Sequence, residues 1–185
     1  MTPPAGTAPP VVTYLEMTKQ PVTPTPPAPA AKLALLRAKR PTVGFYRFLY
    51  DAVGRRRWTE RAVMDDRALI EIIHDDRVEI YVLYAAGVPA GFSELDRRRT
   101  PEIELVHFGL VREFTGLGFQ AHFLRWTIDQ AWTREPERLW VKTKSDDDPH
   151  MLSLYQQSGF VVYDQRAVAG DADDPGRPAP EADND

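Results

Sequence analysis

Hydrophobic and polar positions follow a strand-like period in some stretches of the chain and a helical period in others. Residues 78–84 and 90–95 predict two antiparallel strands joined by a tight turn. Apolar residues recur at helical spacing in 43–53 and 118–132. The other predicted elements are strands at 33–38, 103–111, 138–143 and 160–168, and helices at 65–74 and 149–157. This order predicts the α/β class, with one mixed sheet and helices on both of its faces.

The two ends of the chain differ in composition from the middle. The first thirty residues hold nine of the seventeen prolines, so residues 1–32 are predicted to form an extended arm. Within this arm, the alternating run 11–17 could add an edge strand to the domain or to a neighbouring chain, or act as a docking segment. Residues 169–185 are predicted to be a solvated acidic tail. The folded domain is therefore expected to span residues 33–168.

The charge of the chain is concentrated at its C-terminal end. The net charge is −4, and residues 170–185 carry six acids against one arginine, which leaves the rest nearly neutral. The basic clusters are arginine triplets at 55–57 and 97–99, which are either solvated loop charges or sites that attract an anionic ligand. Because neither triplet is interleaved with stacking aromatic residues, we expect no nucleic-acid partner.

Several kinds of chemistry are excluded by composition. The chain has no cysteine, which removes disulfides and thiol nucleophiles. Its four histidines lie at no ligand spacing, so no metal site is expected. No apolar segment approaches the length that crosses a bilayer, and the N-terminus lacks a basic region followed by an apolar run. We therefore expect a cytoplasmic protein with no membrane partner.

A glycine-rich turn joins the strand 103–111 to the helix 118–132. Gly116 and Gly118 allow a backbone with positive φ, and the helix that follows directs unpaired N–H groups and its positive dipole end toward the same point. Such a turn can seat an anionic, phosphate-bearing ligand. The alternative is a tight turn with no ligand.

Four sequence segments resemble one enzyme family. They are residues 113–120 at the turn, 127–132 at the end of the helix, 147–149, and 155–160. Together with the order of elements, they resemble the GNAT N-acetyltransferases over roughly residues 33–168, most closely a bacterial subgroup with a turn of the form E-F-I-G-R-G-L-G. The resemblance implies a mixed, mostly antiparallel sheet flanked by helices, and acetyl-CoA as the cosubstrate.

The resemblance also implies which residues contact acetyl-CoA. The family's pyrophosphate loop, Q/R-x-x-G-x-G/A, falls on Thr115, Gly116, Leu117, Gly118, Phe119 and Gln120, with its first and last positions substituted. A second register, from Glu113 to Gly118, fits the glycines better but breaks the helix alignment. The pantetheine arm is placed beside Phe108, Gly109 and Leu110, which are otherwise a plain core strand. Gly109 favours the cofactor interpretation, because a glycine inside a strand often marks a bulge or a close approach.

The catalytic residues are likewise implied by the family. Glu104 and Glu94 match glutamates on the fourth and third strands of the subgroup, and Tyr155 matches a tyrosine proposed to protonate the departing thiolate. A five-residue loop at 97–101 would put Glu94 and Glu104 opposite each other, which would raise the pKa of one and make it a base. Alternatively, Glu94 and Glu104 are two solvent-facing strand carboxylates, and Tyr155 is a core aromatic residue. His107 is predicted on the opposite side of its strand from Glu104, and no catalytic histidine is expected.

The predicted function is transfer of an acetyl group from acetyl-CoA to a primary amine, by direct attack in a ternary complex. The acceptor is a small molecule or a peptide, and the protein is a monomer or a homodimer. The alternative is a non-catalytic sensor that binds acyl-CoA, or a protein-interaction module, and the substituted loop and the long terminal segments favour it. A proline-rich interaction protein is a third, weaker hypothesis.

Overall fold

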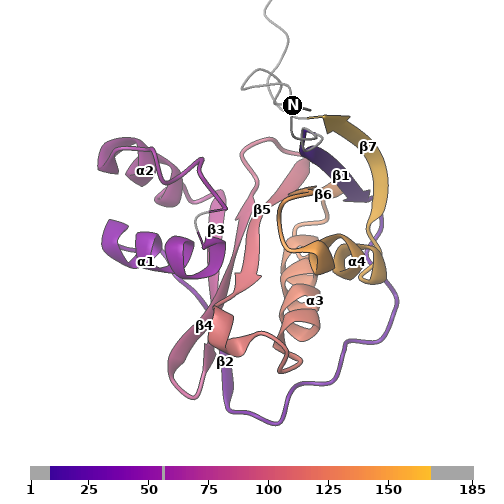
Figure 1. Cartoon of the computed structure of the whole chain (residues 1–185), viewed down its shortest axis with the longest axis horizontal. Coiled ribbons are helices and arrows are strands. Elements are labelled where there is room, and N and C mark those ends of the chain that lie inside the picture. Colours follow the sequence, from indigo (N-terminus) through magenta and orange to yellow (C-terminus); the bar gives the residue numbers. More distant parts are fainter. Residues whose placement is uncertain (1–8, 56, 168–185) are drawn as a thin grey trace, which may run out of the picture.

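Seven strands form a single sheet in the computed structural model, which describes residues 9–55 and 57–167 (Figure 1). The strand order is β2-β3-β4-β5-β6-β1-β7, and every neighbouring pair is antiparallel except β5 and β6. The strands are β1 (Val11–Met17), β2 (Leu33–Arg37), β3 (Val78–Ala85), β4 (Val88–Asp96), β5 (Glu102–Leu110), β6 (Arg138–Lys144) and β7 (Val161–Ala167). The predicted mixed sheet is confirmed. The acidic tail and the first eight residues lie outside the described residues.

Helices cover both faces of the sheet, as predicted. They are α1 (Val43–Gly54), α2 (Asp66–Ile73), α3 (Phe119–Trp132) and α4 (Pro149–Gln157), with a short 3₁₀ turn η1 (Arg112–Phe114). The apolar sides of α1 and α2 pack with Ile80, Val82 and Phe92 on one face. On the other face, α3 and α4 pack against a second core that includes Leu15 and Leu105. In Figure 1 the α1–α2 pair and the α3–α4 pair lie on opposite sides of the strands.

Strand β1 lies inside the sheet, between β6 and β7, and is not an edge strand. The prediction that residues 11–17 form a strand is confirmed, but the three placements considered for it were wrong. Leu15 is fully buried, so this strand contributes to the core beneath α3 and α4. The alternating pattern predicts a strand, but the identity of its neighbours depends on contacts more than 120 residues away along the chain.

The proline-rich stretch after β1 runs around the outside of α3 before it reaches β2 (Figure 1). The Arg125 guanidinium on α3 donates to the carbonyl oxygens of Thr23 at 2.6 Å and Pro21 at 3.1 Å. The His122 Nδ1 atom lies 3.2 Å from the carbonyl oxygen of Pro26. These contacts suit proline, which lacks a backbone donor but keeps its carbonyl acceptor. The segment between β1 and β2 has no helix or strand, and these hydrogen bonds attach it to α3.

Strands β5 and β6 pair along only part of their length. Their parallel pairing runs from Glu102 opposite Arg138 to Leu105 opposite Val141. Beyond this point β5 continues to Leu110 and β6 to Lys144 without pairing to each other. Because the strands separate, backbone groups and side chains of both remain available to a ligand at this place.

A bulge in β5 changes the register against β4. Asp96 lies opposite Glu104, and beyond the register shift Glu94 lies opposite His107. The predicted pairing of Glu94 with Glu104 was therefore wrong. Val106 is the extra residue on the β5 side, and a single extra residue moves the following side chains to the other face of the sheet. As a result, His107 and Glu104 lie on the same face, which corrects the prediction that they lie on opposite faces.

Candidate active site

A narrow cleft of about 70 Å³ lies where β5 and β6 separate. Its walls come from both strands, from the glycine turn and the start of α3, from α4, and from the segment after α1. The lining residues that bear on function are Arg55, Arg57, Val106, Phe108, Gly109, Leu110, Thr115, Gln120, Lys142 and Tyr155. Residues far apart in the sequence therefore converge on one space.

The glycine turn has the predicted backbone conformation. The φ angles of Gly116 and Gly118 are 79° and 78°, in the left-handed region that favours glycine. Nothing lies within 4 Å of a Cβ atom built at either position, so the turn is open on its outer side. Helix α3 begins directly after Gly118, and no side chain caps its first turn. Its first N–H groups can therefore bind an anion.

The other loop residues have different surroundings from one another. Thr115 and Gln120 line the cleft. The Gln120 Nε2 atom lies 3.1 Å from the sulfur of Met151 on α4, so this side chain spans from α3 to α4 beside the cleft. Leu117 is 55% exposed, whereas Phe119 is buried in the core against Phe114. Phe119 can therefore offer a ligand its backbone only.

Phe108, Gly109 and Leu110 all line the cleft. The side chains of Phe108 and Leu110 are also part of the core under α3. A Cβ atom at Gly109 would lie 2.6 Å from the Cγ1 atom of Val53 on α1. The close approach that a glycine in this strand indicated is therefore the packing of α1, and it is not by itself a sign of a ligand.

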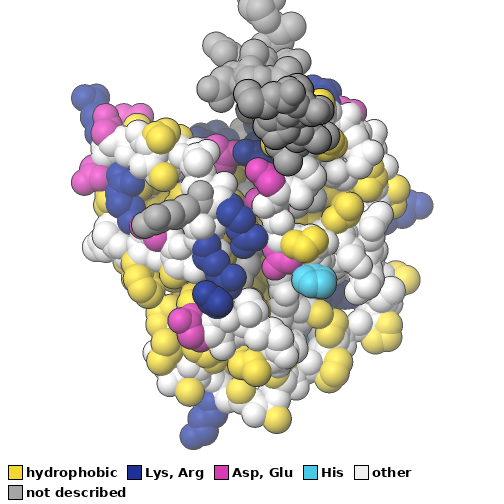
Figure 2. Space-filling view, in the orientation of Figure 1, with side chains coloured by type: hydrophobic (Ala, Val, Ile, Leu, Met, Phe, Trp, Pro, Cys, Tyr) yellow, Lys and Arg dark blue, Asp and Glu magenta, His cyan; other side chains and the backbone are white. Residues whose placement is uncertain are grey.

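A larger cavity of about 550 Å³ adjoins the cleft on the α1–α2 side of the sheet. Glu104 lines this cavity together with Glu60 and Arg61 from the segment between α1 and α2. Val106 and Lys142 line both the cavity and the cleft, so the two spaces meet at these residues. The Lys142 Nζ atom lies 3.9 Å from Glu104 Oε1. Figure 2 shows Lys and Arg side chains gathered over the middle of one face, between the α1–α2 pair and α4.

Glu94 is fully buried and surrounded by partners. Its carboxylate accepts hydrogen bonds from the Tyr46 hydroxyl at 2.6 Å and the Arg61 guanidinium at 2.8 Å, and His107 Nδ1 lies 3.3 Å away. Burial alone would raise the pKa of Glu94, but His107, Arg61 and Tyr46 outweigh it and hold this pKa well below its usual range. The predicted rise in pKa was therefore wrong for Glu94.

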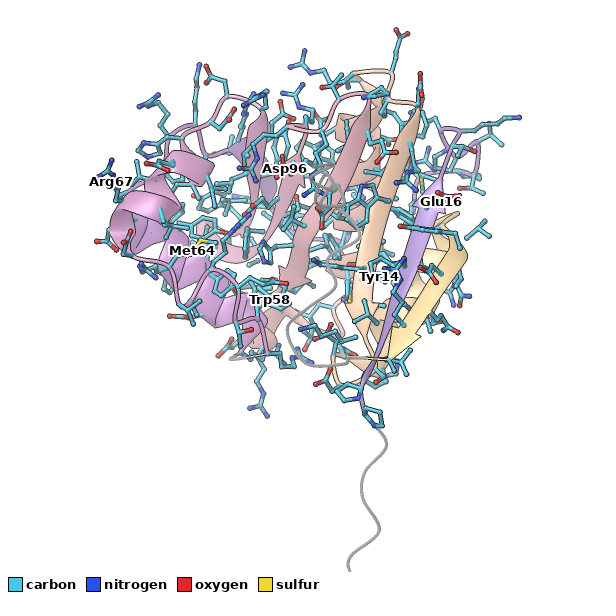
Figure 3. The ribbon with its side chains drawn as sticks, turned by 90° about the horizontal axis from the view of Figure 1, so that it is seen from above. Tyr14, Glu16, Trp58, Met64, Arg67 and Asp96 are labelled. Carbon is cyan, nitrogen blue, oxygen red and sulfur yellow. The ribbon has the colours of Figure 1, made fainter. Side chains whose placement is uncertain are left out.

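His107 is the functional candidate that sequence reasoning missed. Its buried ring packs against Tyr50 and Trp58, and Figure 3 shows Trp58 on the α1 side of the sheet. The Nε2 atom of His107 lies 3.7 Å from Glu60 Oε2. Burial would lower the pKa of His107, but Glu60 and Glu94 outweigh it and raise this pKa.

The contact between His107 and Glu60 also shifts the pKa of Glu60, in the opposite direction. The interaction with His107 lowers the pKa of Glu60 to about 2, although burial opposes the shift. The sequence offered one signal for His107, because it is a polar residue within the mostly apolar run 103–110. This signal did not indicate the bulge that turns the ring inward.

Tyr155 on α4 lies at the wall of the cleft. Its buried ring contacts Phe108 and Phe160, with centroids 6.5 and 5.6 Å away. Burial raises the pKa of Tyr155 well above its usual value, and the charge of Asp147 raises it further. The hydroxyl group therefore keeps its proton at neutral pH, as a general acid must.

The two arginine triplets have different surroundings. Arg97 donates to the buried carboxylate of Glu79 at 2.6 Å, and Arg98 binds both carboxylate oxygens of Asp96. By contrast, Arg55 and Arg57 line the cleft, and residue 56 lies outside the described residues. Pairing within the domain differs from both explanations considered for the triplets, solvated loop charges and attraction of an anionic ligand, and Arg98 and Arg99 also line the larger cavity. Attraction of an anionic ligand suits Arg55 and Arg57.

Residues 9–55 and 57–167 bear on two further properties, metal binding and membrane crossing. Within these ranges, no three His, Asp or Glu residues lie close enough together to hold a metal ion. No helix in the same ranges has both the length and the apolar character needed to cross a membrane.

The splayed mixed sheet, with a glycine turn leading into a helix beside the splay, defines the class of protein. The profile of the Acetyltransferase (GNAT) family matches residues 43–160, which is more than half of the chain. The chain belongs to this family of acetyltransferases. A search of curated proteins finds no match.

Solved structures share the fold at low sequence identity. A conserved protein from Staphylococcus epidermidis has a TM-score of 0.60 and 16% identity, with 84% of this chain and 59% of that chain covered. An IAA acetyltransferase from Bacillus cereus has a TM-score of 0.56 and 19% identity, covering 72% and 79%. A GNAT acetyltransferase from Elizabethkingia anophelis with acetyl-CoA bound has a TM-score of 0.54 and 17% identity, covering 71% and 78%. The chain thus spans less than two thirds of the S. epidermidis protein.

Proposed function

We propose that this protein transfers an acetyl group from acetyl-CoA to a primary amine by direct attack in a ternary complex. One observation carries the proposal: the cleft that Tyr155 lines and the cavity that Glu104 lines have two lining residues in common, Val106 and Lys142. A thioester in the cleft and an amine in the cavity would meet at this junction. The acid and the base would then lie on opposite sides of the reacting carbonyl carbon.

The features around the cleft support acetyl-CoA as the cosubstrate. The open turn at Gly116 and Gly118 and the uncapped start of α3 offer N–H groups to the pyrophosphate. Arg55 and Arg57 add positive charge at the same cleft. The unpaired edges of β5 and β6 suit the thin pantetheine arm. Acetyl-CoA is bound in the E. anophelis relative, which shares this fold.

The side chains at the junction can supply the proton transfers that acetylation of an amine requires. Glu104 would accept a proton from the acceptor amine, directly or through a water molecule, because only the neutral amine is a nucleophile. Tyr155 lines the cleft and would donate its hydroxyl proton to the departing sulfur. Lacking cysteine, the chain cannot form a thiol-linked acyl-enzyme, which favours direct attack.

Glu94 has a structural role in this proposal, because its carboxylate is fully buried and already bound by Tyr46 and Arg61. The acceptor would enter the cavity of about 550 Å³, which is large enough for a small molecule or a peptide end. The subgroup, a cytoplasmic location and a monomeric or homodimeric state remain predictions.

Two measurements test the proposal. Isothermal titration with acetyl-CoA measures binding, and release of free thiol in the presence of polyamines, amino acids, aminoglycosides and peptides measures transfer. Gly118→Arg should abolish binding, because a side chain there strains a left-handed residue and covers the N–H groups of the turn. Gly87→Arg is the matched control, since Gly87 has a φ of 85° and equally open space, but in the β3–β4 turn.

The outcomes separate the possible functions. Binding with thiol release on one acceptor class supports the acetyltransferase and identifies its acceptor. Binding without release on any acceptor favours the non-catalytic acyl-CoA sensor. Absence of binding, or equal binding by Gly118→Arg and the wild type, contradicts the proposed cosubstrate site.

A further inference from the structure

Lys142 occupies the junction between the cleft and the cavity. It lies on β6, just beyond the last residue of that strand that pairs with β5. Lys142 lines both spaces and a third, smaller cavity that His107 also lines. Val106, the other residue common to all three, has no reactive group. Lys142 therefore brings a primary amine to the place where the proposed reaction requires one.

Two carboxylates hold the Lys142 ammonium group. Its Nζ atom lies 3.7 Å from Glu60 Oε1 and 3.9 Å from Glu104 Oε1. Both distances exceed the usual N–H···O range of about 2.7–3.2 Å, so these are ion pairs without close hydrogen bonds. The side chain is 28% exposed. The ammonium group therefore lies next to the proposed base, on a flexible four-carbon stem.

Lys142 makes the contact with Glu104 that an acceptor amine would need in order to lose its proton. An incoming ammonium group would have to reach the same carboxylate to lose its proton. The Lys142 ammonium group already lies there, and Lys142 is also one of the residues that line the cleft with Tyr155. The chain's own lysine thus satisfies the geometric requirements for the acceptor substrate.

We propose that Lys142 is a site of self-acetylation, at which the protein modifies its own side chain with acetyl-CoA. The proposal rests on the proposed function, because it uses the same cosubstrate and the same acid and base. Glu104 removes one proton from the Lys142 ammonium group. The amine nitrogen forms a bond to the acetyl carbon, the carbon–sulfur bond breaks, and the sulfur takes a proton from Tyr155. The second nitrogen proton leaves to water, and the products are an amide and free CoA.

The other lysines of the chain provide an internal reference for chemical acetylation. The chain has five lysines: Lys19, Lys32, Lys39, Lys142 and Lys144. The first three are exposed. Lys144 is half-buried, lies two residues further along β6, and lines the smaller cavity but not the one that contains Glu104. Spontaneous acetylation should favour the exposed lysines, whereas acetylation by the site should favour Lys142.

The test is incubation of the full chain with isotopically labelled acetyl-CoA, followed by peptide mapping by mass spectrometry over time. Lys142 should be labelled at least about 100-fold faster than the three exposed lysines. Its rate should not depend on protein concentration, because the amine and the site belong to one molecule. Glu104→Gln and Tyr155→Phe should slow the labelling of Lys142 and leave the exposed lysines unchanged. Lys142→Arg keeps the charge and should remove the fast label.

Binding of acetyl-CoA, measured by titration on the same sample, separates failure of this inference from failure of the proposed function. If acetyl-CoA binds but Lys142 is labelled no faster than the three exposed lysines, self-acetylation is overturned. The proposed function is then unaffected. Equal labelling of Lys142 and Lys144 also overturns self-acetylation, since Lys144 does not line the Glu104 cavity. Absence of binding overturns both. Fast labelling of Lys142 that persists in Tyr155→Phe and Glu104→Gln shows chemical reactivity alone and overturns the enzymatic step.

Discussion

The surroundings of Glu94 and Glu104 differ sharply, although the two residues lie on adjacent strands. Glu94 is fully buried under α1, and Arg61, Tyr46 and His107 surround its carboxylate. Glu104 lines an open cavity, and the Lys142 Nζ atom lies 3.9 Å from its Oε1 atom. A carboxylate that is buried among matched partners contributes to the folded state, and one at a cavity wall remains able to exchange a proton. The two glutamates should therefore respond differently to the same substitution.

The largest expected effect is on stability at the buried site. Glu94→Gln leaves the Arg61 guanidinium buried without its carboxylate, which should lower the free energy of unfolding by about 3–5 kcal/mol. Urea unfolding measures this change. Glu104→Gln is the matched control, and should cost less than about 1 kcal/mol because its ion pair is longer and partly exposed. Equal losses of unfolding free energy in the two variants would contradict the expected difference between Glu94 and Glu104.

The next effect is on catalysis at the cavity site. Glu104→Gln should lower the turnover number about 1,000-fold, because an amide cannot accept the amine proton, while the affinity for acetyl-CoA stays the same. Steady-state kinetics with the acceptor from the screen measures the change. Glu102→Gln is the control, since Glu102 lines the same cavity but pairs with Arg138 at 2.8 Å. A similar loss in both variants would assign the effect to the charge of the cavity.

A smaller effect is expected across the cleft. Tyr155→Phe should lower the turnover number about 100-fold, near the lower end of the range for general acid catalysis, with little change in acetyl-CoA affinity. Tyr163→Phe on the edge strand β7 is the control, since its side chain is exposed and lines neither the cleft nor the cavity. Unchanged turnover in Tyr155→Phe would make Tyr155 a packing residue and require another proton donor.

The smallest effect concerns the pH dependence of stability. The pKa of His107 is raised in the folded state above its ordinary value of 6.5. The stability that its ion pairs with Glu60 and Glu94 contribute is therefore fully present below about pH 6.5, and is lost as the pH rises through the folded pKa. Thermal unfolding across this range should show the stability gap between wild type and His107→Gln narrowing at higher pH. The exposed His150→Gln should show no such trend, and a gap that is constant with pH would contradict the charged state of His107.

Much of the fold was predictable because its signals are local. The strand alternation, the proline at the start of α4 and the glycines at the turn before α3 each depend on neighbours within a few residues. The Asp148 side chain caps α4 by accepting from the His150 backbone N–H at 3.0 Å. These elements agree with the prediction to within one or two residues.

The errors came from contacts that are distant along the chain. The register of β4 and β5 could not be derived from the length of their loop, because a bulge at Val106 adds one residue. That single residue turned His107 toward Glu94 and moved Glu104 away from it. The location of β1 inside the sheet likewise depends on pairing with β6 and β7. Neither the bulge nor the location of β1 can be derived from the periodicity of the sequence.

By itself, the sequence determined the kind and order of the elements, the positive φ of Gly116 and Gly118, and the absence of thiol chemistry. Only the tertiary structure decided which glutamate is buried and which lines a cavity, and that Lys142 lies between Glu60 and Glu104. The reason is physical: backbone conformation depends on a residue and its near neighbours. The burial of a charge and its partners depend instead on which distant segments pack around it.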